Sequence, residues 1–308
     1  MAVYLSEYIY PEARKALESR AEVVTDFSEP EKVEAIILRV FPVDAALMDR
    51  LPNLRVIGKH GVGCNTIDLE AAKARGITVI NTPLANAQSV AELIVGEMLG
   101  AARNILTAHV QSEEGKFTSV APKQMTGVEL TGKVLGLIGT GNIARRVAKI
   151  LVNGFDMKVV AYDPYVPEDK MKAMGFEKCG TVRELLPKAD FINISVPLTP
   201  ETRDLISGDM FDLFKKDAVL VNAARGGIVN EEGLYEALKT GKLRAAACDA
   251  FVSEPPTKET TKLYELPNFI GTPHIGATTE EALQRMGFEV VEDVLNILAG
   301  GTPAHRVV

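Results

Sequence analysis

The stretch Val134–Ala144, VLGLIGTGNIA, decides the fold, because it combines a buried strand, a glycine turn and the first turn of a helix. Gly139 permits a tight turn after the apolar run, and Gly141 lets the backbone approach a pyrophosphate closely. Ala144 is small enough for the helix to pack closely on the strand, and free N–H groups at the helix start would face the phosphates. The stretch therefore predicts a dinucleotide site. The alternative is a glycine turn in a nucleotide-free doubly wound domain.

A second predicted strand, KVVAYD, ends in a carboxylate at the distance that a dinucleotide fold requires. Asp163 follows Gly139 by 24 residues, and a carboxylate there accepts hydrogen bonds from ribose hydroxyls and repels a 2′-phosphate. The next two residues, Pro164 and Tyr165, carry no positive charge. We therefore expect NAD rather than NADP as the cofactor.

Short β-branched runs alternate with helical segments through most of the chain, which predicts parallel sheets with right-handed crossovers. Before the glycine turn the runs are AVYLS, AIILRV, RVIGKH and ITVINT, and after it they include FINISV, AVLVNA, AAACDA and FIGTPH. A chain of 308 residues is long enough for about two domains with cores of their own. We expect an α/β protein of two doubly wound parallel-sheet domains.

Two long helical patterns, at 88–110 and 279–299, are candidates for connections between the domains. If both are connections, the first domain is discontinuous and the second is inserted into it. The expected substrate-binding domain then comprises residues 1–96 and 284–308 and is flavodoxin-like, and the Rossmann cofactor domain comprises residues 97–283. The alternative is two consecutive domains.

A second glycine pair lies in Lys59–Asn65, KHGVGCN, at the end of the predicted strand RVIGKH. The best helix cap nearby is Asp68, so the next helix starts too late to aim its N-terminus at a phosphate held by the glycines. A short loop with exposed backbone N–H groups remains, and such a nest suits a small anion such as a carboxylate. Lys59 lies beside this nest and is a candidate contact for a second anionic group. The alternative is a plain strand–helix turn with a solvated Lys-His pair.

Three charged or titratable residues follow predicted strands, at the carboxyl ends where open α/β sheets collect catalytic groups. Arg225 follows AVLVNAA, Glu254 follows AAACDAFVS, and His274 follows FIGTP. An arginine fork binds a carboxylate or carbonyl, a histidine donates a proton near neutral pH, and a nearby glutamate favours the protonated imidazole. Hydride transfer to a 2-keto acid needs these roles, so we predict that the three residues form a catalytic set. For each residue alone, the alternative is a surface charge or a capping residue.

The bulk composition argues against several classes of partner. The net charge of −7 disfavours nucleic acid and anionic membrane surfaces, and no apolar run approaches the ~20 residues of a membrane span. Cys64, Cys179 and Cys248 are odd in number and far apart, which fits a reducing compartment and no thiolate metal site. We expect a soluble, cytoplasmic protein without a bound metal.

Nearly the whole chain resembles the D-isomer-specific 2-hydroxyacid dehydrogenases, the group that includes D-3-phosphoglycerate dehydrogenase and glyoxylate/hydroxypyruvate reductase. The matching stretches in the second half are LTGKVLGLIGTGNIARRVA, VPLTPETRDLI, VNAARGGIVNEEGLYEAL, CDAFVSEPP and TPHIGATTEEA. The first half adds GVGCNTIDLEAA and NTPLANAQSVAEL.

The resemblance implies an NAD-dependent enzyme that interconverts a 2-keto acid and its (R)-2-hydroxy acid, with the catalytic set named above. It also implies a homodimer built around the cofactor domains, and a substrate carboxylate held by the backbone of Val62 and Gly63, with Arg225 orienting the substrate. The implied NAD contacts, beside Gly139 and Gly141, are Asn142, Ile143, Asp163, Val196, Ala223, Ala224, Arg225, Asp249, His274, Ile275, Gly276 and Ala277, with Asp249 at the nicotinamide carboxamide.

Two alternative functions are compatible with the same fold. One is an NAD(H)-sensing, corepressor-like binding protein, and the other is a dehydrogenase for a different small anion, formate or phosphite. The complete set of Arg225, Glu254 and His274 favours the enzyme over the binding protein. No feature of the sequence favours formate or phosphite.

Overall fold

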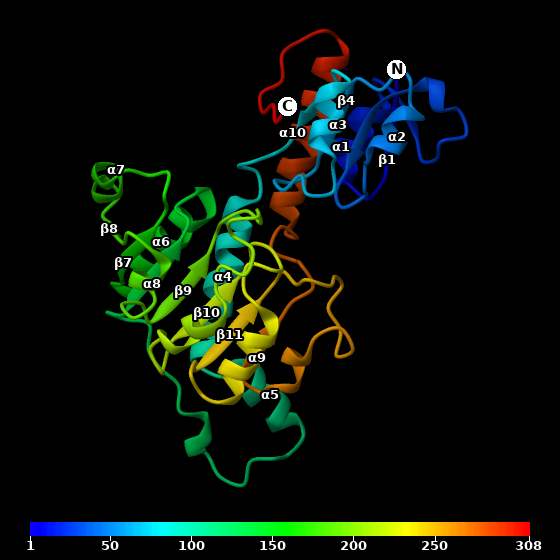
Figure 1. Ribbon diagram of the computed structural model, residues 1–308. Coiled ribbons are helices and arrows are strands. Elements are labelled where there is room, and N and C mark those ends of the chain that lie inside the picture. The colour runs from blue at the N-terminus through cyan, green and yellow to red at the C-terminus, as the bar shows by residue number, and fades with distance from the viewer. The chain divides into compact units, whose positions relative to one another are not determined.

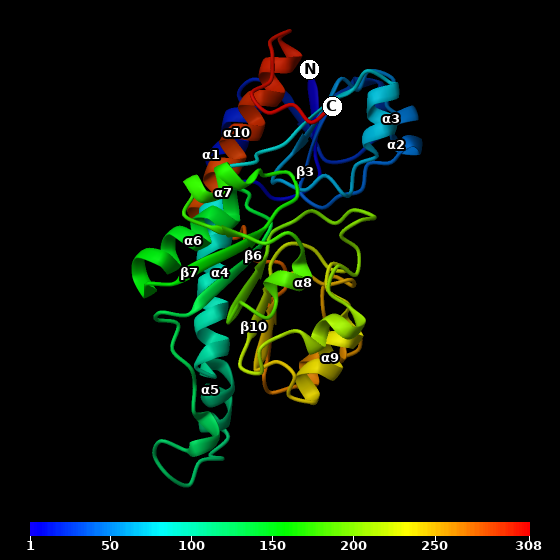
Figure 2. The ribbon, with the colours of Figure 1, turned by 60° about the vertical axis from the view of Figure 1, so that its left-hand side comes forward.

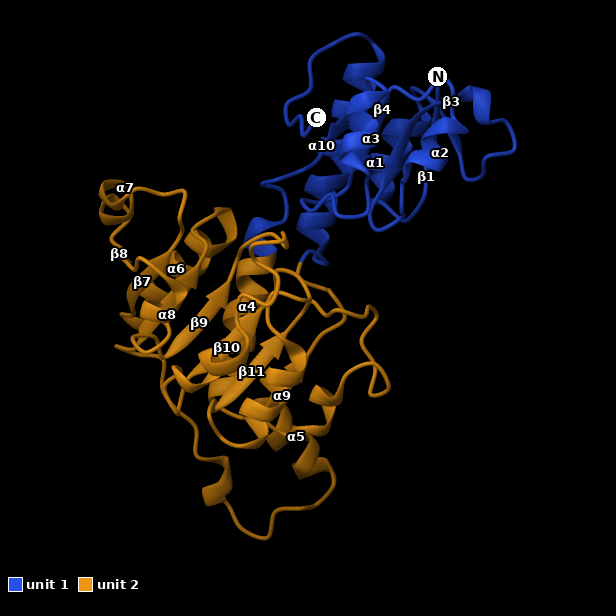
Figure 3. Ribbon diagram, in the orientation of Figure 1, with its two compact units in different colours: residues 1–89, 277–308 blue, residues 90–276 orange.

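The computed structural model describes residues 1–308, and the chain divides into two compact units (Figure 1, Figure 3). Unit 1 comprises Met1–Ser89 and Ala277–Val308, and unit 2 comprises Val90–Gly276. The chain passes between the units near the start of helix α4 (Ala87–Ala102) and again just before helix α10 (Glu280–Leu298). One unit is thus inserted into the other, with divisions after residues 89 and 276 where the sequence suggested 96 and 283.

Unit 1 is built on a five-stranded parallel sheet in the order β2-β1-β3-β4-β5. This is the flavodoxin-like order of a doubly wound sheet. The strands are β1 (Ala2–Leu5), β2 (Glu22–Val24), β3 (Val33–Leu38), β4 (Val56–Lys59) and β5 (Thr78–Ile80).

Helices cover both faces of the unit 1 sheet (Figure 2). Helices α1 (Pro11–Glu18) and α10 pack on one face, and α2 (Ala45–Asp49) and α3 (Leu69–Ala74) pack on the other. A short 3₁₀ turn, η1 (Pro30–Lys32), directly precedes β3. A Cβ on Gly58 would lie 2.7 Å from a methyl group of Val294, so α10 lies directly on β4. The C-terminal tail runs beside β5, where the N–H of Val307 donates to the carbonyl of Val79 at 2.7 Å.

Unit 2 is built on a seven-stranded sheet in the order β12-β11-β10-β9-β6-β7-β8, again parallel throughout. The strands are β6 (Val134–Ile138), β7 (Lys158–Tyr162), β8 (Glu177–Lys178), β9 (Phe191–Ile194), β10 (Val219–Asn222), β11 (Ala245–Cys248) and β12 (Phe269–Gly271). The order reverses between β6 and β9, as in a Rossmann sheet with one additional strand. The predicted fold class, two doubly wound parallel sheets, is confirmed.

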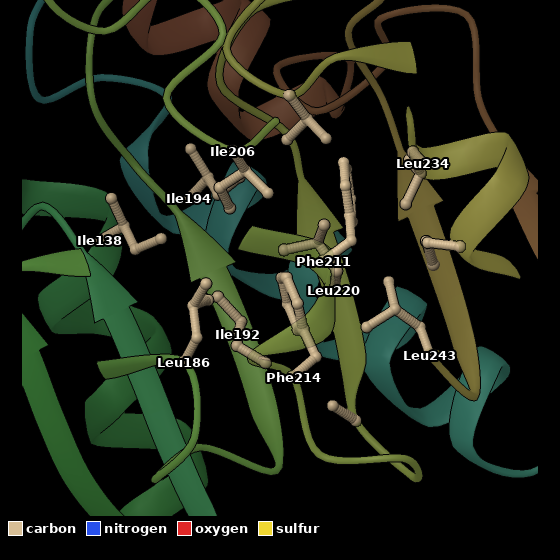
Figure 4. Packing of buried hydrophobic residues seen from close by; sticks show 14 of the residues in the cluster. Ile138, Leu186, Ile192, Ile194, Ile206, Phe211, Phe214, Leu220, Leu234 and Leu243 are labelled. Carbon is tan, nitrogen blue, oxygen red and sulfur yellow. The ribbon is translucent and has the colours of Figure 1, made fainter. Parts of the chain in front are cut away.

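The unit 2 sheet is also covered on both faces. Helices α4 and α6 (Asn142–Phe155) pack on one face. Helices α8 (Val182–Leu185) and α9 (Glu231–Lys239) pack on the other, where Phe211 and Phe214 lie against Ile192 and Leu220 (Figure 4). The remaining helical segments are α5 (Ile105–Glu113), α7 (Glu168–Ala173), and the 3₁₀ turns η2 (Lys123–Met125), η3 (Gly208–Asp212) and η4 (Lys262–Glu265).

The predicted helix at 88–110 is wrong in one respect, because two helices, α4 and α5, occupy this stretch. Asn104 separates them with a φ of +55°, a left-handed conformation that asparagine tolerates better than most residues. The pattern predicted at 279–299 corresponds to a single helix, α10, which Thr279 caps by accepting a hydrogen bond from the N–H of Ala282. Hydrophobic periodicity alone does not reveal a break of only two residues, Arg103 and Asn104.

Candidate active site

The glycine turn predicted from the sequence lies between β6 and α6, where the strand order of unit 2 reverses. Gly139 has a φ of +88°, and a Cβ there would lie 2.5 Å from the carbonyl oxygen of Ser195, so only glycine fits. Gly141 is the N-cap of α6, no side chain caps this helix, and a Cβ at Gly141 would meet nothing within 4 Å. Ala144 is fully buried, as close packing of helix and strand requires. The turn therefore offers uncapped N–H groups beside open space, which fits a pyrophosphate.

Asp163, just after β7, lies against the same turn. Its Oδ2 accepts hydrogen bonds from the backbone N–H of Thr140 at 3.0 Å and from the hydroxyl of Thr140 at 2.9 Å, and its Oδ1 accepts from the N–H of Tyr165 at 3.1 Å. A carboxylate accepts about four hydrogen bonds, so capacity for a ribose hydroxyl remains. Asp163, the predicted ribose contact, is thus hydrogen-bonded directly to the glycine turn.

The turn after β10 carries the predicted cation. Asn222, which is 2% exposed, accepts from the N–H of Ala224 at 3.1 Å and donates to the carbonyl oxygen of Arg225 at 2.9 Å. The Arg225 guanidinium donates to the carbonyl oxygen of Ala224 at 2.6 Å. Gly226 packs under the backbone after β11, where a Cβ would lie only 2.0 Å from the carbonyl carbon of Phe251. The turn that bears Arg225 is therefore fixed by hydrogen bonds to the Asn222 side chain and by close packing of Gly226 on the loop after β11.

Glu254 and His274 form the expected pair. The Nδ1 atom of His274 lies 3.0 Å from each carboxylate oxygen of Glu254, and both side chains are partly exposed. Burial raises the pKa of Glu254, but the hydrogen bond and charge of His274, the N–H of Phe251 and the charge of Arg225 outweigh it, and the pKa lies below its ordinary value. Glu254 is therefore a carboxylate that fixes one nitrogen of the imidazole and leaves Nε2 for other contacts.

Asp249, after β11, holds the turn that bears His274. Its two oxygens accept from the N–H groups of Ile275 at 2.8 Å and Gly276 at 2.7 Å, and Oδ1 lies 2.6 Å from the hydroxyl oxygen of Thr272. His274 itself has a φ of +55°, which is uncommon for a residue with a side chain. The carboxylate of Asp249, 2% exposed, thus stabilises an unusual backbone conformation at the predicted proton donor.

The predicted cofactor and catalytic residues follow the carboxyl ends of six strands of the unit 2 sheet, except Ala277, which is the first residue of the returning segment of unit 1. They are Gly139, Gly141, Asn142 and Ile143 after β6, Asp163 after β7, Val196 after β9, Ala223, Ala224 and Arg225 after β10, Asp249 and Glu254 after β11, and His274, Ile275 and Gly276 after β12. The sequence did not predict Asn222 and Thr272 at this edge, nor Glu97 on α4, which contacts Thr272. The available signal was a polar residue inside or just after an apolar run.

Unit 1 places Lys59 and His60 in its interior. The two residues are 6% and 2% exposed, so the alternative of a solvated Lys-His pair is wrong. The Lys59 ammonium donates to the carbonyl oxygen of Arg39, just after β3. Burial raises the pKa of Glu7, but hydrogen bonds from Ser6 and from two backbone N–H groups after β3, with the charge of Lys59, outweigh it and hold the pKa below its usual value. Lys59 and Glu7 thus stabilise the loop after β3.

His60 is neutral near pH 7. Burial, and then the charge of Arg39, lower the pKa of His60 to about 4, against a smaller opposing effect of the Leu283 backbone. Neither ring nitrogen has a hydrogen bond of normal geometry. These surroundings exclude His60 as a base that works near neutral pH.

The loop after His60 retains the features of an anion nest. Asp68 caps α3 by accepting from the N–H of Ala71 at 2.8 Å, so the helix starts where the sequence predicted and does not point at the glycines. The N–H of Gly61 donates to the hydroxyl of Thr82 at 3.0 Å and is occupied. The N–H groups of Val62 and Gly63 have no partner within the protein, so two donors of the predicted nest are available.

No group of three or more His, Cys, Asp or Glu side chains is arranged to hold a metal ion. None of the helices combines the length and the apolar character needed to cross a membrane.

Comparison with known proteins connects this geometry to a family. Residues 95–276 match the family described as D-isomer specific 2-hydroxyacid dehydrogenase, NAD binding domain. The chain is 43% identical over 307 residues to D-3-phosphoglycerate dehydrogenase of Methanocaldococcus jannaschii, with 97% of this chain and 57% of that protein covered. It therefore spans little more than half the length of that relative. It is 40% identical over 309 residues to hydroxypyruvate reductase of Thermotoga maritima, with 96% and 98% covered. The structure of D-lactate dehydrogenase from Aquifex aeolicus, complexed with NAD and lactic acid, matches with a TM-score of 0.88 at 29% identity and covers 100% of this chain and 99% of that one.

Proposed function

Because the chain belongs to the D-isomer specific 2-hydroxyacid dehydrogenases, with an NAD-binding domain at 95–276, we propose that it interconverts a 2-keto acid and its (R)-2-hydroxy acid. One observation carries the proposal. The Glu254–His274 pair, with both Glu254 oxygens 3.0 Å from Nδ1, follows the same sheet edge as Arg225 and the glycine turn. This edge supplies a proton donor, its carboxylate partner, a fixed cation and a dinucleotide turn, all within unit 2.

Each side chain of the set has a chemical role that its surroundings support. NAD, when bound, supplies the hydride acceptor, and its reduced form the hydride donor. Glu254 holds Nδ1 of His274, so Nε2 delivers the proton to the carbonyl oxygen during reduction and removes it during oxidation. The carboxylate of Glu254 stabilises the imidazolium before the proton is transferred. Arg225 binds the carboxylate and the carbonyl oxygen of the substrate and polarises the carbonyl as negative charge develops on its oxygen.

The residues that would hold the dinucleotide are the chain's own strand ends. The pyrophosphate fits the uncapped N-terminus of α6, and Asp163 fits the ribose hydroxyls. Asp249 has a second role in this proposal, since it accepts hydrogen bonds from the His274 turn and would also accept one from the nicotinamide carboxamide. The proposed contacts are Gly139, Gly141, Asn142, Ile143, Asp163, Val196, Ala223, Ala224, Arg225, Asp249, His274, Ile275, Gly276 and Ala277.

For unit 1 we propose that the N–H groups of Val62 and Gly63 bind the substrate carboxylate, which the two unpaired donors support. Lys59 was the candidate for a second anionic group of the substrate. Its ammonium already donates to the carbonyl oxygen of Arg39, and this contact favours the role of a structural cation. Lys59→Ala distinguishes the two: selective loss of activity toward dianionic substrates supports the anion contact, and equal loss toward all substrates supports the structural role.

The substrate class follows from the relatives only as a proposal. Their names indicate 3-phosphoglycerate and hydroxypyruvate as candidates, and the resemblance of the sequence to the family adds glyoxylate. A panel of glyoxylate, hydroxypyruvate, pyruvate, phosphohydroxypyruvate and branched keto acids, followed by NADH absorbance, tests the proposal, and no turnover with any of them refutes it. His274→Ala should abolish most turnover and leave NADH binding nearly intact. Unchanged turnover in this variant would remove His274 from the mechanism.

We further propose a homodimer, supported by the surface of α5. None of its residues is buried, and Ile105, Leu106 and Val110 are 53%, 51% and 50% exposed, which is a large apolar surface for one short helix. Sedimentation velocity should give a dimer for the native chain and a monomer for Leu106→Glu. Val152→Glu, which places the same charge at an exposed position on α6, is the matched control and should remain a dimer.

We also propose a cytoplasmic location, which the three free cysteines support.

A further inference from the structure

A glutamate that the proposed mechanism does not use lies behind the His274 turn. Glu97, on α4 in unit 2, is 4% exposed and sits among apolar residues of the helix such as Ile94 and Met98. Its Oε1 lies 3.2 Å from the hydroxyl oxygen of Thr272, and its Oε2 has no hydrogen-bond partner. The same hydroxyl oxygen lies 2.6 Å from Oδ1 of Asp249. One threonine hydroxyl therefore stands between two buried carboxyl groups.

Counting protons assigns the charge of each group. The Thr272 hydroxyl has one proton and cannot donate to both carboxyl groups at once. Asp249 already accepts hydrogen bonds from the N–H groups of Ile275 and Gly276, so it is the ionised carboxylate and takes the shorter Thr272 contact. The longer contact is a hydrogen bond only if Glu97 carries a proton and donates it to the hydroxyl oxygen.

The surroundings of Glu97 agree with this assignment. Burial, and then the charge of Asp249, raise the pKa of Glu97 to about 8, while the contact with Thr272 opposes them. The titratable groups that face Glu97 are Asp249, whose negative charge disfavours a second one, and the thiol of Cys248, which burial keeps neutral, so neither supplies a compensating positive charge. A buried carboxylate without a cation is costly, so the neutral acid is the stable form near pH 7.

We propose that Glu97 is a positioning residue that stays protonated at neutral pH and holds the His274 turn through Thr272 and Asp249. The chain of hydrogen bonds runs from the Glu97 carboxylic acid to the Thr272 hydroxyl, then to the Asp249 carboxylate, and ends at the backbone N–H groups of Ile275 and Gly276. Its effect on turnover rests on the proposed function of His274. The protonation state of Glu97 does not.

Kinetics of two variants test the positioning role. Glu97→Gln keeps a donor for Thr272 and should retain kcat within about threefold, whereas Glu97→Leu has a similar size without a donor and should lower kcat by about tenfold or more. The dissociation constant of NADH should change little in either. Glu168→Gln, an exposed glutamate on α7, is the control. Wild-type kcat in Glu97→Leu, or equal loss in both Glu97 variants, would overturn the positioning role.

Unfolding as a function of pH tests the protonation state without any substrate. An acid whose folded pKa is raised to about 8 from 4.5 loses its favourable contribution as the pH rises through this interval. The folding equilibrium constant of the wild type, relative to Glu97→Gln, should therefore fall about tenfold per pH unit between pH 5 and 8 and then level off. Parallel curves for the wild type and Glu97→Gln would overturn the proposal. If the wild type reduces no keto acid, the proposed function fails, and this measurement still decides the state of Glu97.

Discussion

Gly226→Ala is the sharpest test of how the loops of unit 2 position the proposed catalytic residues. A Cβ at Gly226 would lie 2.0 Å from the carbonyl carbon of Phe251, 2.1 Å from its oxygen and 2.3 Å from the nitrogen of Val252. Ordinary contact begins at 3.4 Å, so one backbone segment must move by about 1.4 Å. The two segments carry Arg225 on one side and Glu254 on the other. Since a misplacement of ~1 Å costs roughly 100-fold in rate, kcat/KM should fall about 100-fold, or ~2.7 kcal/mol.

The assay is steady-state oxidation of NADH with the best substrate of the panel, together with urea unfolding. The clash should also lower the free energy of unfolding by about 1–3 kcal/mol. Gly154→Ala on α6 is the matched control, because a Cβ there meets nothing within 4 Å and the helix gains about 0.5–1 kcal/mol when glycine becomes alanine. Gly226→Ala with wild-type kcat/KM and a wild-type unfolding midpoint would refute the reasoning.

Three further predictions concern the cofactor site and the interior of unit 1. Asp163→Asn keeps an acceptor for Thr140 but removes the charge, so the preference for NADH over NADPH, measured as a ratio of kcat/KM, should fall about tenfold or more; an unchanged ratio would contradict it. Gly139→Ala places a Cβ 2.5 Å from a backbone oxygen at a φ of +88°, and the dissociation constant of NADH from fluorescence titration should rise at least about tenfold, whereas a wild-type constant would count against the fit of the turn. The pKa of His60 is lowered from 6.5 to about 4, so the folded state loses stability as the pH falls through this interval. The wild type should lose ~2 kcal/mol more than His60→Leu between pH 6.5 and 5, and parallel unfolding curves would exclude a neutral buried His60.

Much of the fold was predictable because its determinants are local. The VLGLIGTGNIA stretch predicts a strand, a turn and a helix start at the places where the structure has them, and Asp68 caps α3 as its position suggested. The break at Asn104 was not predictable from periodicity, since both flanking segments have helical patterns and only the backbone angle of one residue differs. Local signals therefore predict elements better than they predict interruptions of an element.

The candidate site could be predicted from the sequence only at residues whose type and position both indicate a chemical role. Arg225, Glu254 and His274 are recognisable as candidates because each is a charged or titratable residue that follows a predicted strand. Asn222 and Glu97 are single polar residues within apolar segments of the sequence. Their roles depend on what lies opposite across the sheet or helix, and a sequence does not record which side chain that is. The burial of Lys59 was unpredictable for the same reason, because the carbonyl oxygen that accepts from its ammonium belongs to Arg39, at the end of a different strand.

Glu97 and His60 show how two buried groups of opposite type shape the response of the same chain to pH. Both are neutral near pH 7, but the folding equilibrium responds to them with opposite sign. His60 makes folding more favourable as the pH rises from 4 to 6.5, and Glu97 makes it less favourable from about 4.5 to 8. Between about pH 4.5 and 6.5 the two contributions to the free energy of folding cancel. As far as these two groups are concerned, the stability of the wild type is therefore nearly constant there and declines only between about pH 6.5 and 8. Because the residues belong to different units, their contributions should add, and His60→Leu should make the decline begin near pH 4.5 instead of 6.5.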